Sequence, residues 1–405
     1  MIKKASILAL VICLVLSMLS PILVQAQSRL TILDSSAQAE FPSGLSFNLS
    51  AQSAVDITDI RLCYTVDRVS FAQVTSEVYI EVVPASTIDV NWTLEMVKIG
   101  GLPPGSSVDY WWIVKDASGG RIETTPSRVQ FDDNRYSWRS LIEGEVTIYW
   151  YKGNDSFARE IMLSAQQALA RLTEDTGAKL EKPVKLYIYT NAQDLRGAMI
   201  YPQEWTGGVA FTRYGIIAIG IDSDNIHWGK RAVAHELTHL VIHQMTLNPY
   251  NDLPTWLDEG LAMHTEGVLG LEYTAYLNKA IAEGSLISVR SLSSPFSAYA
   301  GQSYLSYAQS YSLVEFLISK YGQAKMLELL LIFRQGSSYD GALEKVYGFD
   351  MDGLDTLWQD YVTVSTQQTE DKGRHPALIE KLPVLATALL LTLGLATENW
   401  IWRRG

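Results

Sequence analysis

Two histidines and a glutamate in one short segment have the spacing of a metal-binding helix. The chain of 405 residues contains the string His235-Glu236-Leu237-Thr238-His239, with apolar residues on both sides. On a helix, residues four apart project from the same face about 6 Å from each other, so His235 and His239 can bind one metal ion. Glu236 then lies beside the metal and can take a proton from a bound water. The alternative is an amphipathic helix that simply buries two histidines.

A second segment can complete such a site. Asp252 can cap a new helix, and Pro254 suits its first turn because a missing N–H costs nothing there. A catalytic zinc site needs three protein ligands and an open position for water. Glu259 can supply the third ligand from this helix, packed antiparallel against the first. Its neighbour Asp258 is the alternative, because successive helical positions differ by about 100° and only one of the two acids can face the metal.

The string Trp-Leu-Asp-Glu-Gly-Leu-Ala at 256–262 resembles the third-ligand helix of the gluzincin metallopeptidases, in particular the peptidase MA-like group and its aminopeptidase-N-type relatives. In those families the glutamate before Gly-[Phe/Leu]-Ala binds zinc, which implies Glu259 as a ligand. The segment from His239 to Glu259 is one residue longer than the aminopeptidase-N-type spacing, and the extra residue fits in the loop 248–252. Asp258 is then expected behind the ligands or in solvent. The resemblance covers 145–365 and implies an α+β zincin (thermolysin-like) domain with one Zn²⁺ per chain.

The resemblance also implies a mechanism for peptide hydrolysis. Zinc would lower the pKa of a bound water to about 7 and polarise the scissile carbonyl. Glu236 would act as general base and then deliver the proton to the leaving amine. The segment 304–311 resembles the tyrosine-bearing helix of the peptidase MA-like group, which implies Tyr307 as donor to the oxyanion. Tyr311 and Tyr304 are the alternatives, and these tyrosines can also simply pack.

Two further histidines are rival ligands. His243 lies eight residues beyond His235, about 12 Å along the helix axis, which is too far to share one zinc ion. We expect it near the helix end, interacting with terminal carbonyl groups. His264 follows Glu259 by five residues and points elsewhere on that helix, so we expect a structural role for it.

The residues before the first helix predict how a substrate binds. The runs 183–190 and 207–221 are rich in β-branched and aromatic residues and predict strands. In gluzincins the strand just ahead of the zinc helix is a sheet edge that pairs with extended peptide, and Gly207–Phe211 would be that edge. Aminopeptidase-N-type enzymes have Gly-x-Met-Glu-Asn there, whose glutamate binds the free amine of the substrate. The absence of an acid in Gly207–Phe211 favours an endopeptidase, although Gly207-Gly208 could also be a turn.

The two ends predict export and membrane attachment. Residues 1–26 have the lysines, apolar run and small terminal residue of a signal peptide, with an uncleaved anchor as the alternative. Residues 382–402 predict a transmembrane anchor followed by two arginines, with an interfacial or core helix as alternatives. The polar stretch 366–381 predicts a linker. Together they predict an exported protein, anchored at the cell surface or secreted.

Charge and cysteine content narrow the partners. The net charge is −12, and removal of the signal peptide takes away two lysines and no acid, which makes it −14. We therefore expect no nucleic-acid partner. Cys13 lies in the signal peptide, which leaves Cys63 as the one cysteine of the mature chain, so we expect no intrachain disulfide. We expect Cys63 to be buried in a strand.

The sequence predicts a multidomain protein. Residues 27–140 contain short alternating segments separated by Gly/Pro turns and predict an all-β sandwich of immunoglobulin or fibronectin type III character. The resemblance implies that residues 141–365 form a peptidase domain. The predicted strands of the first domain are 45–51, 60–66, 78–83, 90–96, 108–115 and 128–131. The predicted function is a zinc metallopeptidase acting on peptides or proteins; the alternatives are a catalytically inactive surface-binding protein and a zinc hydrolase of another amide.

Overall fold

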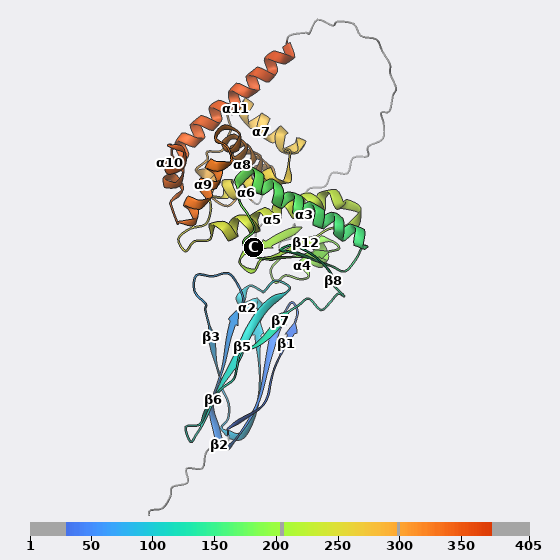
Figure 1. The fold of residues 1–405 in the computed structure, drawn as a ribbon, viewed down its shortest axis with the longest axis vertical. Coiled ribbons are helices and arrows are strands. Elements are labelled where there is room, and N and C mark those ends of the chain that lie inside the picture. Colours follow the sequence, from blue (N-terminus) through green and yellow to red (C-terminus); the bar gives the residue numbers. More distant parts are fainter. Residues whose placement is uncertain (1–29, 203–205, 298–299, 375–405) are drawn as a thin grey trace, which may run out of the picture.

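The computed structural model describes residues 30–202, 206–297 and 300–374, and it shows an all-β region followed by an α+β region (Figure 1). The all-β region contains β1 (Thr31–Glu40), β2 (Gly44–Val66), β3 (Ser76–Ile80), β4 (Ala85–Glu95), the short helix α2 (Met96–Ile99), β5 (Ser106–Asp116), β6 (Arg121–Glu123) and β7 (Ser127–Phe131). All of its strand pairs are antiparallel.

The strand β2 is shared between the two halves of this region. Its first half pairs with β1 and β4, and its second half pairs with β3 and β5. The rings of Phe47 and Tyr64 lie 6.3 Å apart although a straight strand would hold them more than about 50 Å apart, so β2 folds back on itself. Phe47 also lies 5.1 Å from Tyr110 of β5. The two halves therefore face each other as layers of a β-sandwich.

The predicted all-β region is thus confirmed, with corrections to its strands. The segments 45–51 and 60–66, predicted as separate strands, are the two arms of β2. The strand β1 was not predicted, because its sequence TILDSSAQAE is mostly polar and its residues are at most half-buried. Cys63 is buried in β2 as a free thiol, as predicted. The immunoglobulin or fibronectin III type stays a prediction.

A five-stranded mixed sheet forms the base of the second region. Its strands are β8 (Arg139–Glu143), β9 (Val146–Trp150), β10 (Val184–Tyr189), β11 (Gly208–Phe211) and β12 (Ile216–Gly220). Their order is β11-β12-β10-β9-β8, with β9, β10 and β12 parallel and both outer strands antiparallel. The predicted domain boundary at 140/141 falls inside β8.

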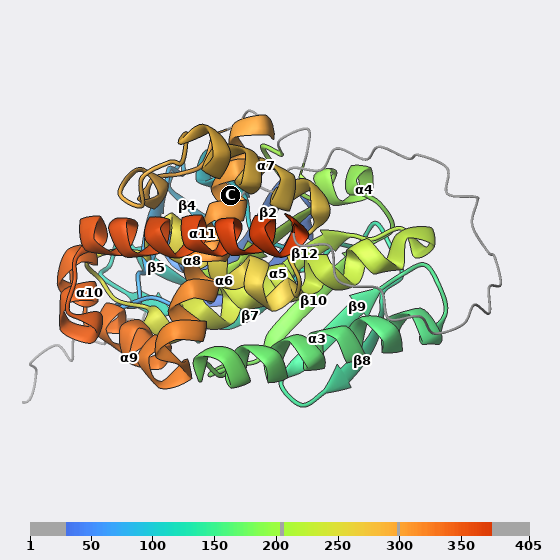
Figure 2. The same ribbon diagram turned by 90° about the horizontal axis from the view of Figure 1, so that it is seen from above.

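Helices cover one face of this sheet. They are α3 (Asp155–Thr176), α5 (Ile226–Thr246), α6 (Thr255–Glu266), α7 (Leu271–Glu283), α8 (Ala300–Tyr321), α9 (Gln323–Arg334), α10 (Tyr339–Tyr347) and α11 (Met351–Arg374), with a 3₁₀ turn η1 (Thr212–Tyr214) after β11. The short helix α4 (Ala192–Arg196) instead packs in the core on the other face, through Leu195. Asn154 caps α3 through the N–H of Phe157, and Gly177 ends it with a positive φ. In Figure 2, α3 runs alongside β8 and β9. The segment 304–311, which resembles a tyrosine-bearing helix, lies within α8.

The other face of the sheet packs against the β-sandwich. Alternation along β10 explains this, because Leu186 and Ile188 point into the core under the helices while Tyr187 and Tyr189 belong to the core shared with the sandwich. The ammonium group of Lys185 donates a hydrogen bond of 2.9 Å to the carbonyl oxygen of Gly105 at this junction. The sandwich is therefore packed directly on the sheet that supports the helices.

The predictions for the two ends fall largely outside the described residues. The predicted signal peptide (1–26) and transmembrane segment (382–402) are both beyond them. Within the described ranges, no helix combines the length and apolar character that a bilayer span requires. The helix α11 continues to Arg374, and so takes in the first part of the predicted linker 366–381.

Candidate metal centre

Helices α5 and α6 place the predicted ligands in the protein interior. The α5 residues from Ala232 to Ile242 are all buried, as are those of α6 from Trp256 to Met263. The helix α6 begins at Thr255, after Pro254, whose extended backbone (φ −62°, ψ 137°) suits the N-cap position. Pro254, predicted in the first turn, is therefore itself the N-cap, and Asp252, predicted as the cap, lies two residues before it.

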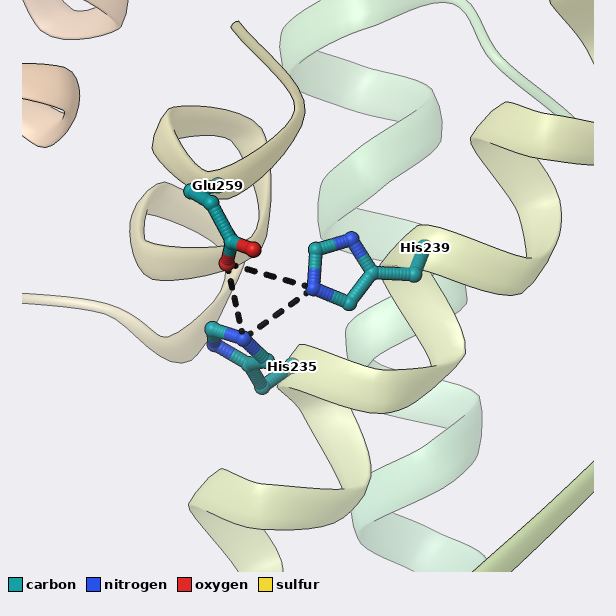
Figure 3. Close-up of side chains that lie close together, drawn as sticks. All are labelled: His235, His239 and Glu259. Carbon is teal, nitrogen blue, oxygen red and sulfur yellow. Dashed lines mark hydrogen bonds and ion pairs between the residues drawn. The ribbon is translucent and has the colours of Figure 1, made fainter. Parts of the chain in front are cut away.

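Three side chains converge between these helices (Figure 3). The Nε2 atoms of His235 and His239 lie 3.1 Å apart, and Oε2 of Glu259 lies 3.4 Å from each of them. The three residues are at most 7% exposed. They are the predicted ligands, and Glu259 is the acid that faces both Nε2 atoms.

The size of this triangle fits a zinc ion. Zinc binds histidine nitrogen and carboxylate oxygen at about 2.0–2.2 Å, and in a tetrahedron such ligand atoms lie about 3.3–3.5 Å from one another. The two separations of 3.4 Å lie within that range, and the separation of 3.1 Å between the two Nε2 atoms is only slightly shorter. Two imidazoles and one carboxylate are also a ligand set that leaves a fourth position for water.

Each histidine is held by a second carboxylate on the far side of its ring. Nδ1 of His235 lies 2.7 Å from Oε1 of Glu266, and Nδ1 of His239 lies 2.9 Å from Oδ1 of Asp258. Because an ionised carboxylate only accepts, these contacts place a proton on Nδ1 and leave Nε2 with a lone pair for a metal. Asp258 thus lies behind the ligands. The orienting role of Glu266 was missed by the sequence analysis, although its spacing of seven residues from Glu259 puts both on one side of α6.

The electrostatics of the cluster favour a bound cation. Burial alone would lower the pKa of His235, but its contacts with Glu259 and Glu266 outweigh burial and raise that pKa to about 10. Burial would raise the pKa of Glu259, but the charge and hydrogen bonds of the two histidines hold it well below its usual value. The buried carboxylates therefore draw positive charge to this point, which a divalent ion can supply in place of a proton.

The three candidate tyrosines have different surroundings. Burial raises the pKa of Tyr307 well above its ordinary value, and the negative charges of Glu259 and Glu236 raise it further. Tyr311 instead stacks on His264 with 5.8 Å between ring centroids. Tyr304 packs against tyrosines of α7 at 5.1 and 5.4 Å. Of the three, only Tyr307 has its pKa shifted by residues of the centre.

The rival histidines lie outside the triad. His243 was predicted to interact with carbonyl groups at the helix end, but its Nε2 lies 3.0 Å from Oδ2 of Asp258. Asp258 can reach it because its two carboxylate oxygens bind histidines one helical turn apart. His264 lies between Asp175 and Glu315, at 3.4 and 2.9 Å, which agrees with the structural role predicted for it.

The segment Gly207–Phe211, predicted as the substrate-binding edge, forms the strand β11 (Gly208–Phe211). Among the described strands, β11 pairs only with β12, and it packs against α5. Gly208 is inside this strand, so the alternative of a turn at Gly207-Gly208 is wrong. The second edge of β11 is therefore the place where an extended peptide could add to the sheet.

This fold and triad define the zincin class, in which two neighbouring helices supply a His-x₃-His pair and a glutamate to one metal. The family model described as Peptidase MA superfamily matches residues 164–364. This part of the chain belongs to that superfamily, which confirms the resemblance to the gluzincin peptidase MA-like group.

Solved structures give more distant likenesses. An M1 zinc metallopeptidase from Deinococcus radiodurans aligns over 80% of this chain and 90% of its own, with 13% identity and a TM-score of 0.33. Aminopeptidase A of Legionella pneumophila, in complex with aspartic acid, aligns over 81% of this chain and 50% of its own, with 11% identity and a TM-score of 0.35. Wild-type OgpA from Akkermansia muciniphila aligns over 26% of this chain and 28% of its own, with 7% identity and a TM-score of 0.21. The chain therefore spans under a third of the length of OgpA. A search of curated proteins gave no match.

Proposed function

We propose that this protein is a zinc-dependent metallopeptidase that hydrolyses internal bonds of peptides or proteins. The observation that carries the proposal is the convergence of His235, His239 and Glu259, whose ligand atoms lie 3.1–3.4 Å apart in the protein interior. That spacing and that ligand chemistry suit one zinc ion per chain.

The chain's own residues divide the remaining work. Bound zinc supplies a Lewis acid, which activates water and polarises a carbonyl. Glu236, buried one residue after the first histidine, accepts the proton of the attacking water and passes it to the leaving amine. Tyr307 keeps its phenolic proton because of its raised pKa, and so can donate a hydrogen bond to the oxygen of the scissile carbonyl as negative charge develops there.

Cleavage of internal bonds is supported by the sequence of β11. Aminopeptidase-N-type enzymes place a glutamate in this strand to hold a free amine, whereas this chain has Val209, Ala210 and Phe211. Nothing acidic in β11 would anchor the N-terminus of a substrate. A peptide can therefore continue past the scissile bond in both directions.

We further propose that the enzyme works outside the cytoplasm, at the cell surface or secreted. The support is the signal-like composition of residues 1–26 and the apolar segment 382–402, both read from the sequence. Protease accessibility of the chain on intact cells tests this. Protection until the cells are lysed would contradict it.

The experiment that tests the chemistry compares two forms of the purified protein. We expect one zinc per chain in both the unmodified protein and Glu236→Gln, and hydrolysis of casein by the unmodified protein alone. Equal hydrolysis by both forms would remove Glu236 from the mechanism. Zinc binding without hydrolysis by either form would indicate the alternative, a catalytically inactive binding protein.

A further inference from the structure

A polar groove lies at the C-terminal end of α5, between the helical region and the β-sandwich. It consists of two adjoining cavities of about 270 and 320 Å³ that share Val69, Arg213 and Gln244 in their walls. The first also has Ala210 and His243 in its lining. The groove is therefore bounded by both parts of the protein.

The groove is connected to the metal centre through two elements. His243 is one helical turn beyond His239 on the same face of α5, and both bind the carboxylate of Asp258. Ala210 belongs to β11, the strand with an open edge, and Arg213 follows directly in η1. A peptide lying along β11 would therefore pass from the metal centre into the groove.

Positive charge collects along the groove although the chain as a whole has a net charge of −12. Arg68, Lys182 and Arg213 line it, and all three are exposed. Among the described residues, the structure gives none of these three side chains a carboxylate partner within 4.0 Å, whereas many other cations of the chain are paired. These three cations are therefore available to a ligand.

The other charged residues of the groove do not cancel this excess of positive charge. Lys185 is occupied by the carbonyl group of Gly105. The two acids in the lining are Asp67 and Asp252, and Asp67 lies 3.8 Å from Arg128. Four cations thus face two acids, one of which is already paired.

The β-sandwich builds one wall of the groove. The loop between β2 and β3 contacts η1 through a hydrogen bond of 2.6 Å from the N–H of Val69 to the carbonyl oxygen of Arg213. Arg68, the residue before Val69, lines the same cavity as Arg213. The sandwich thereby contributes a charged side chain to the substrate path.

We propose that this groove selects peptide substrates with acidic side chains on the N-terminal side of the scissile bond. We take the peptide to pair antiparallel with β11, as β12 does on the other edge, which puts its N-terminal residues next to Phe211 and Arg213. Carboxylates there would meet Arg213 first and then Arg68 and Lys182. The proposal deepens the proposed function and rests on it for the place of the scissile bond.

Binding to the full-length, zinc-loaded Glu236→Gln protein tests the groove separately from catalysis. Two fluorescent peptides are compared by anisotropy, one with glutamates and one with glutamines in the N-terminal half. We expect at least about tenfold tighter binding of the glutamate peptide at low salt, with a smaller preference at high salt. Equal binding of the two peptides, or no binding of either, would overturn the proposal.

Variants that each remove one positive charge from the Glu236→Gln protein show which residues cause the preference for the glutamate peptide. Arg213→Gln is expected to reduce the preference for the glutamate peptide about fivefold or more, and Arg68→Gln to reduce it by a smaller factor. Lys345→Gln, which removes an exposed cation of α10 that does not line the groove, is the matched control and should leave the preference unchanged. An equal loss in the control would contradict a specific groove.

The sites of cleavage give a second readout with the unmodified enzyme. A mixed peptide library analysed by mass spectrometry should show enrichment of Asp and Glu on the N-terminal side of the cleaved bond, and Arg213→Gln should reduce it. Cleavage without this enrichment would overturn the proposal that the groove selects acidic side chains, and would leave the peptidase proposal intact. A binding preference for the glutamate peptide without any cleavage would support the groove proposal and contradict the peptidase proposal.

Discussion

Glu266 holds His235 from behind, with its Oε1 2.7 Å from Nδ1 of the imidazole, on the far side of the ring from Glu259. Arg231 contacts the other oxygen of Glu266 at 2.8 Å, so the carboxylate itself is held in position. This chain of contacts fixes the ring so that Nε2 points at the metal position.

Removal of this support should weaken the metal centre without removing a ligand. We expect Glu266→Ala to lower zinc affinity about 10–100-fold, because the imidazole loses both its orientation and the acceptor for its Nδ1 proton. Zinc competition with a chromophoric chelator measures this. Glu283→Ala, an exposed acid at the end of α7, is the control, and equal affinity in both variants would show that Glu266 has no part in metal binding.

Substitutions of the neighbouring acids Glu259 and Asp258 in α6 should have different effects on the zinc content of the protein. Glu259→Ala is expected to abolish zinc retention after dialysis against a chelator, because it removes one of three ligands. Asp258→Asn keeps the ligands, and should retain zinc with an affinity lower by about tenfold. Metal analysis of the two variants checks this, and loss of zinc from Asp258→Asn alone would reverse the assignment.

Tyr307 should affect turnover and leave metal binding unchanged. Loss of one hydrogen-bond donor to a developing oxyanion lowers kcat about 10²–10³-fold. We therefore expect the Tyr307→Phe substitution to lower kcat by a factor in that range and to leave the zinc content unchanged. Tyr311→Phe and Tyr304→Phe should stay within about a factor of two, because their rings pack away from the triad. Activity of Tyr307→Phe close to that of the unmodified enzyme would exclude it as the donor.

Gly260 should be essential for the position of α6. A Cβ atom at this residue would lie 2.4 Å from the carbonyl oxygen of Ser310 in α8, and backbone cannot move aside cheaply. We expect Gly260→Ala to destabilise the fold by about 1–3 kcal/mol and to displace Glu259. The measurement is the thermal midpoint, with Gly270→Ala as control because its nearest neighbour would be 3.6 Å away. Equal midpoints would contradict the close contact of α6 and α8.

The parts of the site that could be predicted from the sequence depend on short spacings. His235 and His239 are four residues apart on one helix, and the motif around Glu259 is contiguous. Contacts between elements could not be predicted in this way. The pairing of Glu266 with His235 depends on how α6 is rotated against α5, and Arg213 becomes part of a groove only because a β-sandwich loop lies against it.

The fold shows the same division. The helix α3 follows from apolar periodicity, since its buried side chains recur at helical spacing, whereas the central parts of α5 and α6 are buried all round. The return of β2 on itself was missed because nothing local in 45–66 distinguishes one bent strand from two separate strands. The packing of the sandwich on the sheet could not be predicted either. Alternate residues of β10 are buried on its two faces, but the sequence does not tell which part of the chain covers the second face.

The most direct test of the central claim is a titration of the metal-free protein with zinc while hydrolysis of casein is followed. We predict that activity rises in proportion to added zinc and stops rising at one equivalent per chain, and that Glu236→Gln binds the same equivalent and stays inactive. Activity in the metal-free protein, or none at any zinc concentration, would contradict a catalytic zinc held by His235, His239 and Glu259.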